Sequence, residues 1–181
     1  MVTYISMLRG INVSGQKIIK MTELKALFES AGFKEVTTYI QSGNVIFKSK
    51  ESDPSAVSAT IVKAIDKKFG YQVVVVIREP KEMAAVIKKN PFVGKRGVDE
   101  ERLYVAFLEA KPAPALVKAL EPLTAKSKDE YEVIGKEIYM HFPGGMGKTL
   151  FSNNFFEKKL KVAATTRNWN TVKTLYSMSS D

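Results

Sequence analysis

The order of strand-like and helix-like segments constrains the fold more than any other feature of the sequence. Strand-like segments are short and rich in β-branched or aromatic residues, whereas helix-like segments carry apolar residues at three- and four-residue spacing. The first half of the chain predicts, in order, a strand over 3–8, a loop over 9–20, a helix over 21–31, strands over 36–40 and 45–48, a helix over 54–69, a strand over 73–77 and a helix from Pro80. This β-α-β-β-α-β order is typical of the ferredoxin-like arrangement.

The second half of the chain repeats the order without repeating the residues. It predicts a strand over 103–108, a helix over 114–120, strands over 131–134 and 137–142, a helix after Gly147 and a last helix around 172–176. We therefore predict an α+β fold of two consecutive βαββα(β) ferredoxin-like lobes packed as one globule. The expected boundaries are an N-terminal lobe over 1–90, a linker over 91–101 rich in Gly and charge, and a C-terminal lobe over 102–181 with two closing helices.

Local signals predict how several elements begin, end and pack. Asp53 precedes Pro54 and should cap the helix that Gly70 ends, while Thr22 should cap the preceding helix. Gly135 and Lys136 predict a two-residue hairpin turn. The 73–77 segment is apolar throughout, which predicts a central strand covered on both faces.

Composition limits the class of protein and of site. The chain has no cysteine, which excludes disulfides and thiolate ligands and favours a reducing, cytoplasmic location. No apolar run is long enough to span a bilayer, so no membrane association is expected. His141 is the single histidine; on its strand we expect a solvated position, and we expect no metal site and no cofactor.

Two polar loops are expected to meet at one edge of the first sheet. In the ferredoxin-like arrangement strands one and two are parallel with strand three between them, so the end of strand one adjoins the turn after strand two. This brings Arg9 to Gly15 beside Ser42 to Asn44. The candidate anion-binding residues here are Arg9, Asn12, Lys17, Ser42 and Asn44. The alternative is structural: the glycines shape the turn and Arg9 pairs with a carboxylate.

Two further segments carry candidate ligand-binding residues. The stretch from Gly144 to Thr149 follows a strand, as a phosphate-binding loop does. Phe142, however, stands where a Walker sequence needs glycine, so a plain turn is favoured. Lys148 alone remains a candidate ligand-binding residue in this stretch. Before the last helix, Arg167 could reach a phosphate or carboxylate, and either Asn168 or Asn170 could cap the helix. Trp169 should fill the core or an interface, the alternative being a stacked base.

Three motifs resemble a bacterial family. They are Leu8-Arg9-Gly10-Ile11-Asn12-Val13, then Gln41-Ser42-Gly43-Asn44-Val45, then the stretch from Thr166 to Val172. Their order and spacing resemble bacterial domain-of-unknown-function family 1697, and the resemblance covers nearly the whole chain. It implies two related α/β lobes but no activity, cofactor or catalytic residue. Lys148-Thr149 departs from the small polar pair expected there.

Charge points to a class of partner. Lys and Arg total 28 against 19 Asp and Glu, a formal net charge of +9 that favours phosphate-bearing partners, although a solvated lysine surface also accounts for it. Our first hypothesis is a protein that binds a phosphate-bearing small molecule, nucleotide or nucleic acid. The alternatives are an enzyme acting on such a ligand, for which no catalytic residue can be named, and an interaction module using an exposed sheet edge. The oligomeric state stays open.

Overall fold

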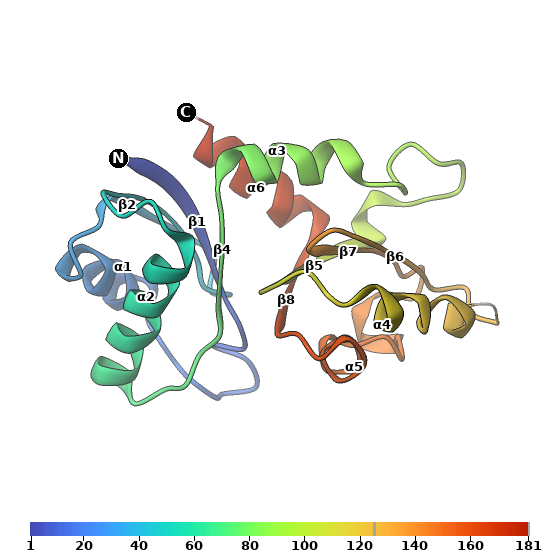
Figure 1. Ribbon diagram of the computed structural model, residues 1–181, viewed down its shortest axis with the longest axis horizontal. Helices are drawn as coiled ribbons and strands as arrows, with labels where there is room; N and C mark the ends of the chain where they lie inside the picture. The colour runs from blue at the N-terminus through green and yellow to red at the C-terminus, as the bar shows by residue number, and fades with distance from the viewer. Residues whose placement is uncertain (125, 181) are drawn as a thin grey trace. The chain divides into compact units, whose positions relative to one another are not determined.

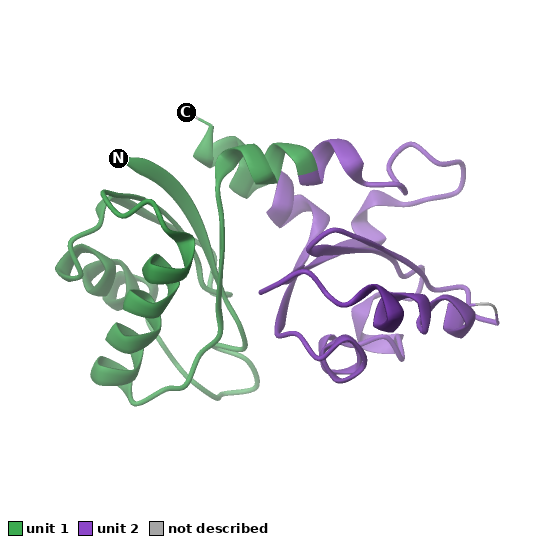
Figure 2. Ribbon diagram, in the orientation of Figure 1, with its two compact units in different colours: residues 1–85, 174–181 green, residues 86–173 purple. Residues whose placement is uncertain are grey.

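The computed structural model describes residues 1–124 and 126–180 of the chain. It divides into two compact units, coloured separately in Figure 2: unit 1 contains residues 1–85 and 174–181, and unit 2 contains residues 86–173. Both boundaries fall inside helices, one in α3 (Pro80–Lys89) and one in α6 (Trp169–Ser179). The stretch expected as a linker, 91–101, lies within unit 2.

Unit 1 is built on an antiparallel four-stranded sheet (Figure 1). Its elements are β1 (Val2–Leu8), α1 (Met21–Ser30), β2 (Lys34–Tyr39), β3 (Asn44–Ser49), α2 (Pro54–Phe69) and β4 (Val75–Arg78). The strand order is β2-β3-β1-β4, and β3 is antiparallel to both β1 and β2. Strands β1 and β2 are therefore parallel with β3 between them, as the sequence predicts.

The core of unit 1 lies between the two helices and one face of the sheet. Leu24 and Phe28 of α1 and Ile61 of α2 are fully buried against sheet residues that include Tyr4 and Phe47. The rings of Phe28 and Phe47 meet edge to face, with centroids 5.2 Å apart. Burial of this apolar face stabilises the unit by about 25 cal/mol for each Å² removed from water.

Strand β4 corrects one prediction. All four of its residues are buried, three of them apolar and the fourth Arg78, but β4 lies at the end of the strand order and not in the centre. The prediction of a central strand is wrong because burial of both faces does not determine how many neighbours a strand pairs with. An apolar edge strand and an apolar central strand have the same sequence pattern.

The helix ends follow local chemistry, with one exception. Asp53 accepts a hydrogen bond from the Ser55 amide at the start of α2, and Gly70 ends that helix with φ 71°, as predicted. Thr22 is not a cap, because α1 begins at Met21 and places Thr22 inside the first turn. The residue before α1, Lys20, makes no side-chain capping bond.

Unit 2 contains a second antiparallel sheet with strand order β6-β7-β5-β8. Its elements are β5 (Leu103–Leu108), α4 (Pro114–Lys118), β6 (Glu130–Ile134), β7 (Glu137–His141), α5 (Asn153–Leu160), β8 (Ala164–Asn168) and the short 3-10 helices η1 (Glu100–Arg102), η2 (Glu121–Thr124) and η3 (Met146–Lys148). Strand β8 is absent from the sequence-based prediction. It is short and mostly polar, and it pairs with β5 from Leu108 opposite Ala164 to Tyr104 opposite Asn168.

His141 occupies a buried position, so the expected solvated position is wrong. Only 7% of the residue is exposed. Its Nδ1 lies 3.3 Å from a carboxylate oxygen of Glu130, the residue opposite it in the β6–β7 register, and the ring of Phe92 lies 6.1 Å away. The alternation rule fails here because β7 is covered on both faces, and Tyr139 is buried as well.

Two classes of feature are absent from the residues described. Across 1–124 and 126–180, no helix combines the length and apolar character needed to cross a membrane. Over the same residues, no three His, Cys, Asp or Glu side chains gather as a metal site would require.

Candidate functional site

One asparagine joins the two loops expected to form the site. The side-chain nitrogen of Asn12 donates to the carbonyl of Gln41 at 2.8 Å and to the carbonyl of Ile19 at 2.9 Å, and its Oδ1 accepts from the Ile19 amide at 2.8 Å. The loop after β1 thus lies against the turn between β2 and β3. Their predicted neighbourhood is confirmed, and we call residues 9–20 and 40–43 together the loop edge.

Gly43 holds the turn close to the end of β1. Its carbonyl accepts from the amide of Leu8 at 2.9 Å. Its φ is +84°, and a Cβ there would lie 2.7 Å from the Cδ1 of Ile11. Both the backbone conformation and the contact therefore require glycine.

Ser42 and Asn44 close the same turn. Asn44 is fully buried, and its side-chain nitrogen donates to the Tyr39 carbonyl at 3.0 Å and to the Ser42 hydroxyl at 2.9 Å. These bonds give both residues a structural task within unit 1. Their expected contact with a ligand stays a prediction, and for Asn44 such a contact requires the turn to open.

The backbone of the loop edge is unusual. Four of its residues other than glycine have positive φ: Asn12 at 54°, Ser14 at 51°, Lys17 at 46° and Ile40 at 49°. A β-branched residue such as Ile40 rarely adopts this conformation. Each such residue costs about 1–3 kcal/mol and persists only where surrounding contacts hold it, an arrangement that is concentrated at functional sites.

The loop edge is cationic and partly apolar. It carries Arg9, Lys17 and Lys20, and neither of its segments contains a carboxylate. Lys20 is exposed, whereas Arg9 and Lys17 are half-buried and the Nζ of Lys17 donates to the Gln72 carbonyl at 2.6 Å. The apolar side chains that it exposes are Val13 at 57%, Ile18 at 53% and Ile40 at 47%.

The glycine-rich stretch of unit 2 does not form a phosphate-binding loop. Lys148 is exposed, but it ends a 3-10 helix of 3 residues, and α5 begins only at Asn153 with Ser152 as its cap. Gly145 has φ 81°, and a Cβ there would lie 2.9 Å from the guanidinium of Arg102. The stretch is therefore a turn closed on Arg102, as the unfavourable spacing indicated.

Arg167, Asn168 and Trp169 lie at the junction of β8 and α6. Arg167 is buried and donates to the Thr165 hydroxyl at 2.7 Å and to the Thr166 carbonyl at 2.9 Å, and burial lowers its pKa to about 10. The Oδ1 of Asn168 accepts from the Thr171 amide at 2.8 Å, so of the two predicted caps it is Asn168 that caps α6. Trp169 is only 2% exposed, so it is buried in the fold.

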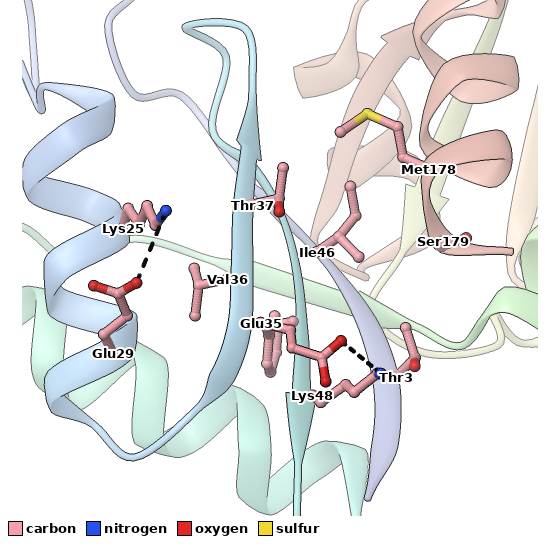
Figure 3. Close-up of a pocket in the computed structure, with 11 residues that line it drawn as sticks. Thr3, Lys25, Glu29, Glu35, Val36, Thr37, Ile46, Lys48, Met178 and Ser179 are labelled. Atoms are coloured by element: carbon pink, nitrogen blue, oxygen red, sulfur yellow. Dashed lines mark ion pairs between the residues drawn. The ribbon is translucent and has the colours of Figure 1, made fainter. Parts of the chain in front are cut away.

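The structure contains a second candidate site that the sequence does not predict. A pocket beside β2 brings together Lys25, Glu29, Glu35 and Lys48, which we call the charged pocket (Figure 3). Lys25 and Glu29 are visible in the sequence as a helical pair four residues apart. Glu35 and Lys48 meet only because β2 and β3 pair, and a bulge in β2 displaces the register between Lys34 and Thr37. No sequence signal marks that bulge.

Comparison with known proteins places the fold and the family. A solved structure titled "The structure of conserved bacterial protein SP0830 from Streptococcus pneumoniae" is similar over 100% of this chain and 99% of its own, with a TM-score of 0.72 and 20% identity. That likeness shows the fold. No curated protein matches. The family model described as "Protein of unknown function (DUF1697)" matches residues 1–139, which include the first two of the three motifs, so the chain belongs to the DUF1697 family.

Proposed function

We propose that the protein binds a phosphate-bearing ligand, a nucleotide or a nucleic acid, at the loop edge. One observation carries the proposal: Arg9, Lys17 and Lys20 share this edge with no carboxylate in either of its segments. Cations interspersed with carboxylates neutralise one another, whereas cations alone attract phosphate. The net charge of +9 adds long-range attraction of the same sign.

Backbone geometry supports the same ligand. Alternation of right- and left-handed backbone conformations turns successive amides toward a common point, which makes a concave site for anions. Positive φ at Asn12, Ser14 and Gly15 provides such reversals within four residues of one another. Because Asn12 holds the loop at both ends, these amides do not need to be ordered when a ligand binds.

We also infer that the two lobes are ferredoxin-like and that the protein is cytoplasmic. The strand orders β2-β3-β1-β4 and β6-β7-β5-β8 support the first inference, because each puts the third strand between the first and second of its lobe. The absence of cysteine supports the second. Neither specifies the ligand, since one fold serves many functions.

Binding is favoured over catalysis because the loop edge offers no proton acceptor of suitable strength. Its two segments contain no Asp, Glu or His, so any reaction there would depend on fixed positive charge alone. A protein partner is the second candidate, and it is favoured by the exposed apolar side chains of the loop edge, which are Val13, Ile18 and Ile40. Strand addition at β2 is disfavoured by its bulge.

The direct test is the affinity for a fluorescein-labelled single-stranded 12-mer at low salt, measured by anisotropy. The double variant Lys17→Gln, Lys20→Gln should raise Kd by about tenfold, because two phosphate contacts are lost. The matched control is Lys67→Gln, Lys68→Gln, which removes two exposed cations from the last turn of α2. Equal loss in both double variants, or no loss in either, would remove the loop edge as the site.

A further inference from the structure

The charged pocket lies at the free edge of the unit 1 sheet, beside edge strand β2. Its volume is about 340 Å³, which is within the range of small-molecule sites. Its charged residues are two cations, Lys25 and Lys48, and two anions, Glu29 and Glu35. The charge of this lining sums to zero, in contrast to the loop edge, so a polyanion has no preference for it.

Each cation is paired with one anion, but neither ion pair uses all the hydrogen-bonding positions of its two charged groups. The Nζ of Lys48 lies 2.6 Å from Glu35, and the Nζ of Lys25 lies 3.9 Å from Glu29 (Figure 3). An ammonium has three donors and a carboxylate about four acceptor positions, so one ion pair leaves most of them for a ligand. The Glu35 side chain is 63% exposed and the Lys48 side chain 34%, so solvent and solutes reach both.

Glu35 is held in a conformation that its ion pair does not explain. Its φ is 50°, and it lies within the β2 bulge between Lys34 and Thr37. The left-handed conformation costs about 1–3 kcal/mol, whereas an exposed ion pair contributes about 0–1 kcal/mol. The ion pair with Lys48 is therefore too weak to offset the energetic cost of this backbone conformation. Bulges recur beside binding sites, where the extra residue redirects a side chain.

The pocket also has an apolar wall. Ile46 of β3 and Met178 of α6 line it beside the Glu35–Lys48 pair (Figure 3). Ile46 is 6% exposed, and Met178 is half-buried. Methionine is flexible and fits apolar groups of varied shape. A ligand that reaches the ion pair therefore has an aliphatic surface within the same cavity.

We propose that the charged pocket binds a small zwitterion with an aliphatic side chain, of the class of the α-amino acids leucine and methionine. In such a molecule an ammonium and a carboxylate stand on one carbon, which complements an anion and a cation 2.6 Å apart. The ligand ammonium donates to Glu35, and the ligand carboxylate accepts from Lys48. The aliphatic side chain lies against Ile46 and Met178. This site is independent of the loop edge.

Three related compounds test the charge requirement by calorimetric titration of the full chain. They are L-leucine, L-leucinamide, which lacks the carboxylate, and 4-methylpentanoate, which lacks the ammonium. L-Leucine should bind, and each of the other two should bind at least about tenfold more weakly, because one charged contact is lost. Equal binding of all three, or no binding of leucine at millimolar concentration, overturns the proposal.

Variants separate the ligand contact from the fold. Glu35→Gln should weaken leucine binding by about tenfold or more, and Lys67→Gln on α2 is the control that should leave it unchanged. Glu35→Gly relieves the positive φ, so the melting temperature should hold or rise while leucine binding is lost. Retention of leucine binding in Glu35→Gly would show that the carboxylate has no role and would overturn the assignment.

Discussion

The side-chain amide of Asn12 donates a hydrogen bond of 2.8 Å to the main-chain carbonyl of Gln41, joining the loop after β1 to the turn between β2 and β3. The same side chain makes two hydrogen bonds with the backbone of Ile19. Its polar atoms are therefore engaged within the protein. Asn12 shapes the loop edge, whereas Lys17 and Lys20 carry the charge that a phosphate would meet.

Removal of the Asn12 side chain should destabilise unit 1. The variant Asn12→Gly suits φ 54° but loses all three bonds, so its free energy of unfolding should fall by about 1–3 kcal/mol. Asn12→Ala should lose more, because alanine keeps the strained φ. Urea denaturation at constant salt measures both variants. A glycine variant as stable as the parent protein would show that the bonds between the loops are dispensable.

Alanine substitutions at two glycines with similar φ separate the cost of steric crowding from the cost of the backbone conformation. Gly43→Ala should cost about 2–4 kcal/mol, because its Cβ would meet Ile11 at 2.7 Å in addition to the strain of φ +84°. Gly10→Ala should cost only about 1 kcal/mol, since φ is +69° but nothing lies within 4 Å. Thermal or urea unfolding of the pair checks this. Equal losses would mean that Gly43 does not pack tightly against the end of β1.

A rising salt concentration should weaken oligonucleotide binding at the loop edge, and the size of this effect depends on the number of phosphate contacts. Each phosphate contact contributes a slope of about 0.7 to the fall of log affinity with log salt for a single strand. Replacing Lys17 and Lys20 with glutamine should therefore reduce the slope by about 1.4. Titrations over a series of NaCl concentrations give the value. An unchanged slope in the double variant would mean that neither lysine contacts phosphate.

Alkaline pH should destabilise the fold through buried tyrosines. Burial raises the pKa of Tyr139, with a smaller contribution from the charge of Glu137, and burial raises the pKa of Tyr4 and Tyr131 as well. A raised folded-state pKa contributes stability that is complete below the ordinary tyrosine pKa of about 10 and is lost as pH rises beyond it.

Urea denaturation at about pH 9 and about pH 11 measures this loss. The variant Tyr139→Phe removes one titrating group, so its free energy of unfolding should fall less between the two pH values than that of the parent protein. The comparison also corrects for lysines that titrate in the same range. A parallel fall in both proteins would assign the pH dependence to other groups.

Features determined by neighbouring residues were predictable from the sequence. The bounds of β5, Leu103–Leu108, coincide with the prediction, and the two-residue turn at Gly135-Lys136 is confirmed by the pairing of Ile134 with Glu137. The capping of α2 by Asp53 has the same local origin. Even the meeting of the loops at Asn12 follows, because element order alone sets which strand ends adjoin.

Features determined by distant residues were not predictable. The sequence suggested that Arg167 could reach a phosphate or carboxylate, yet β8 pairs with β5 and Arg167 is buried. His141 is buried for a related reason, since Phe92 covers it from a remote part of the chain. The Glu35 bulge depends on the register between β2 and β3, which no residue of β2 specifies alone.

The most direct test of the loop edge is an NMR titration of the isotopically labelled protein with a single-stranded 12-mer oligonucleotide, followed through backbone amide shifts. Binding at the loop edge predicts the largest shifts over residues 9–20 and 40–43, and their loss in the Lys17→Gln, Lys20→Gln variant. Shifts centred instead on the lysines of α2 or on Lys148, or shifts that persist unchanged in the variant, would contradict the proposed site.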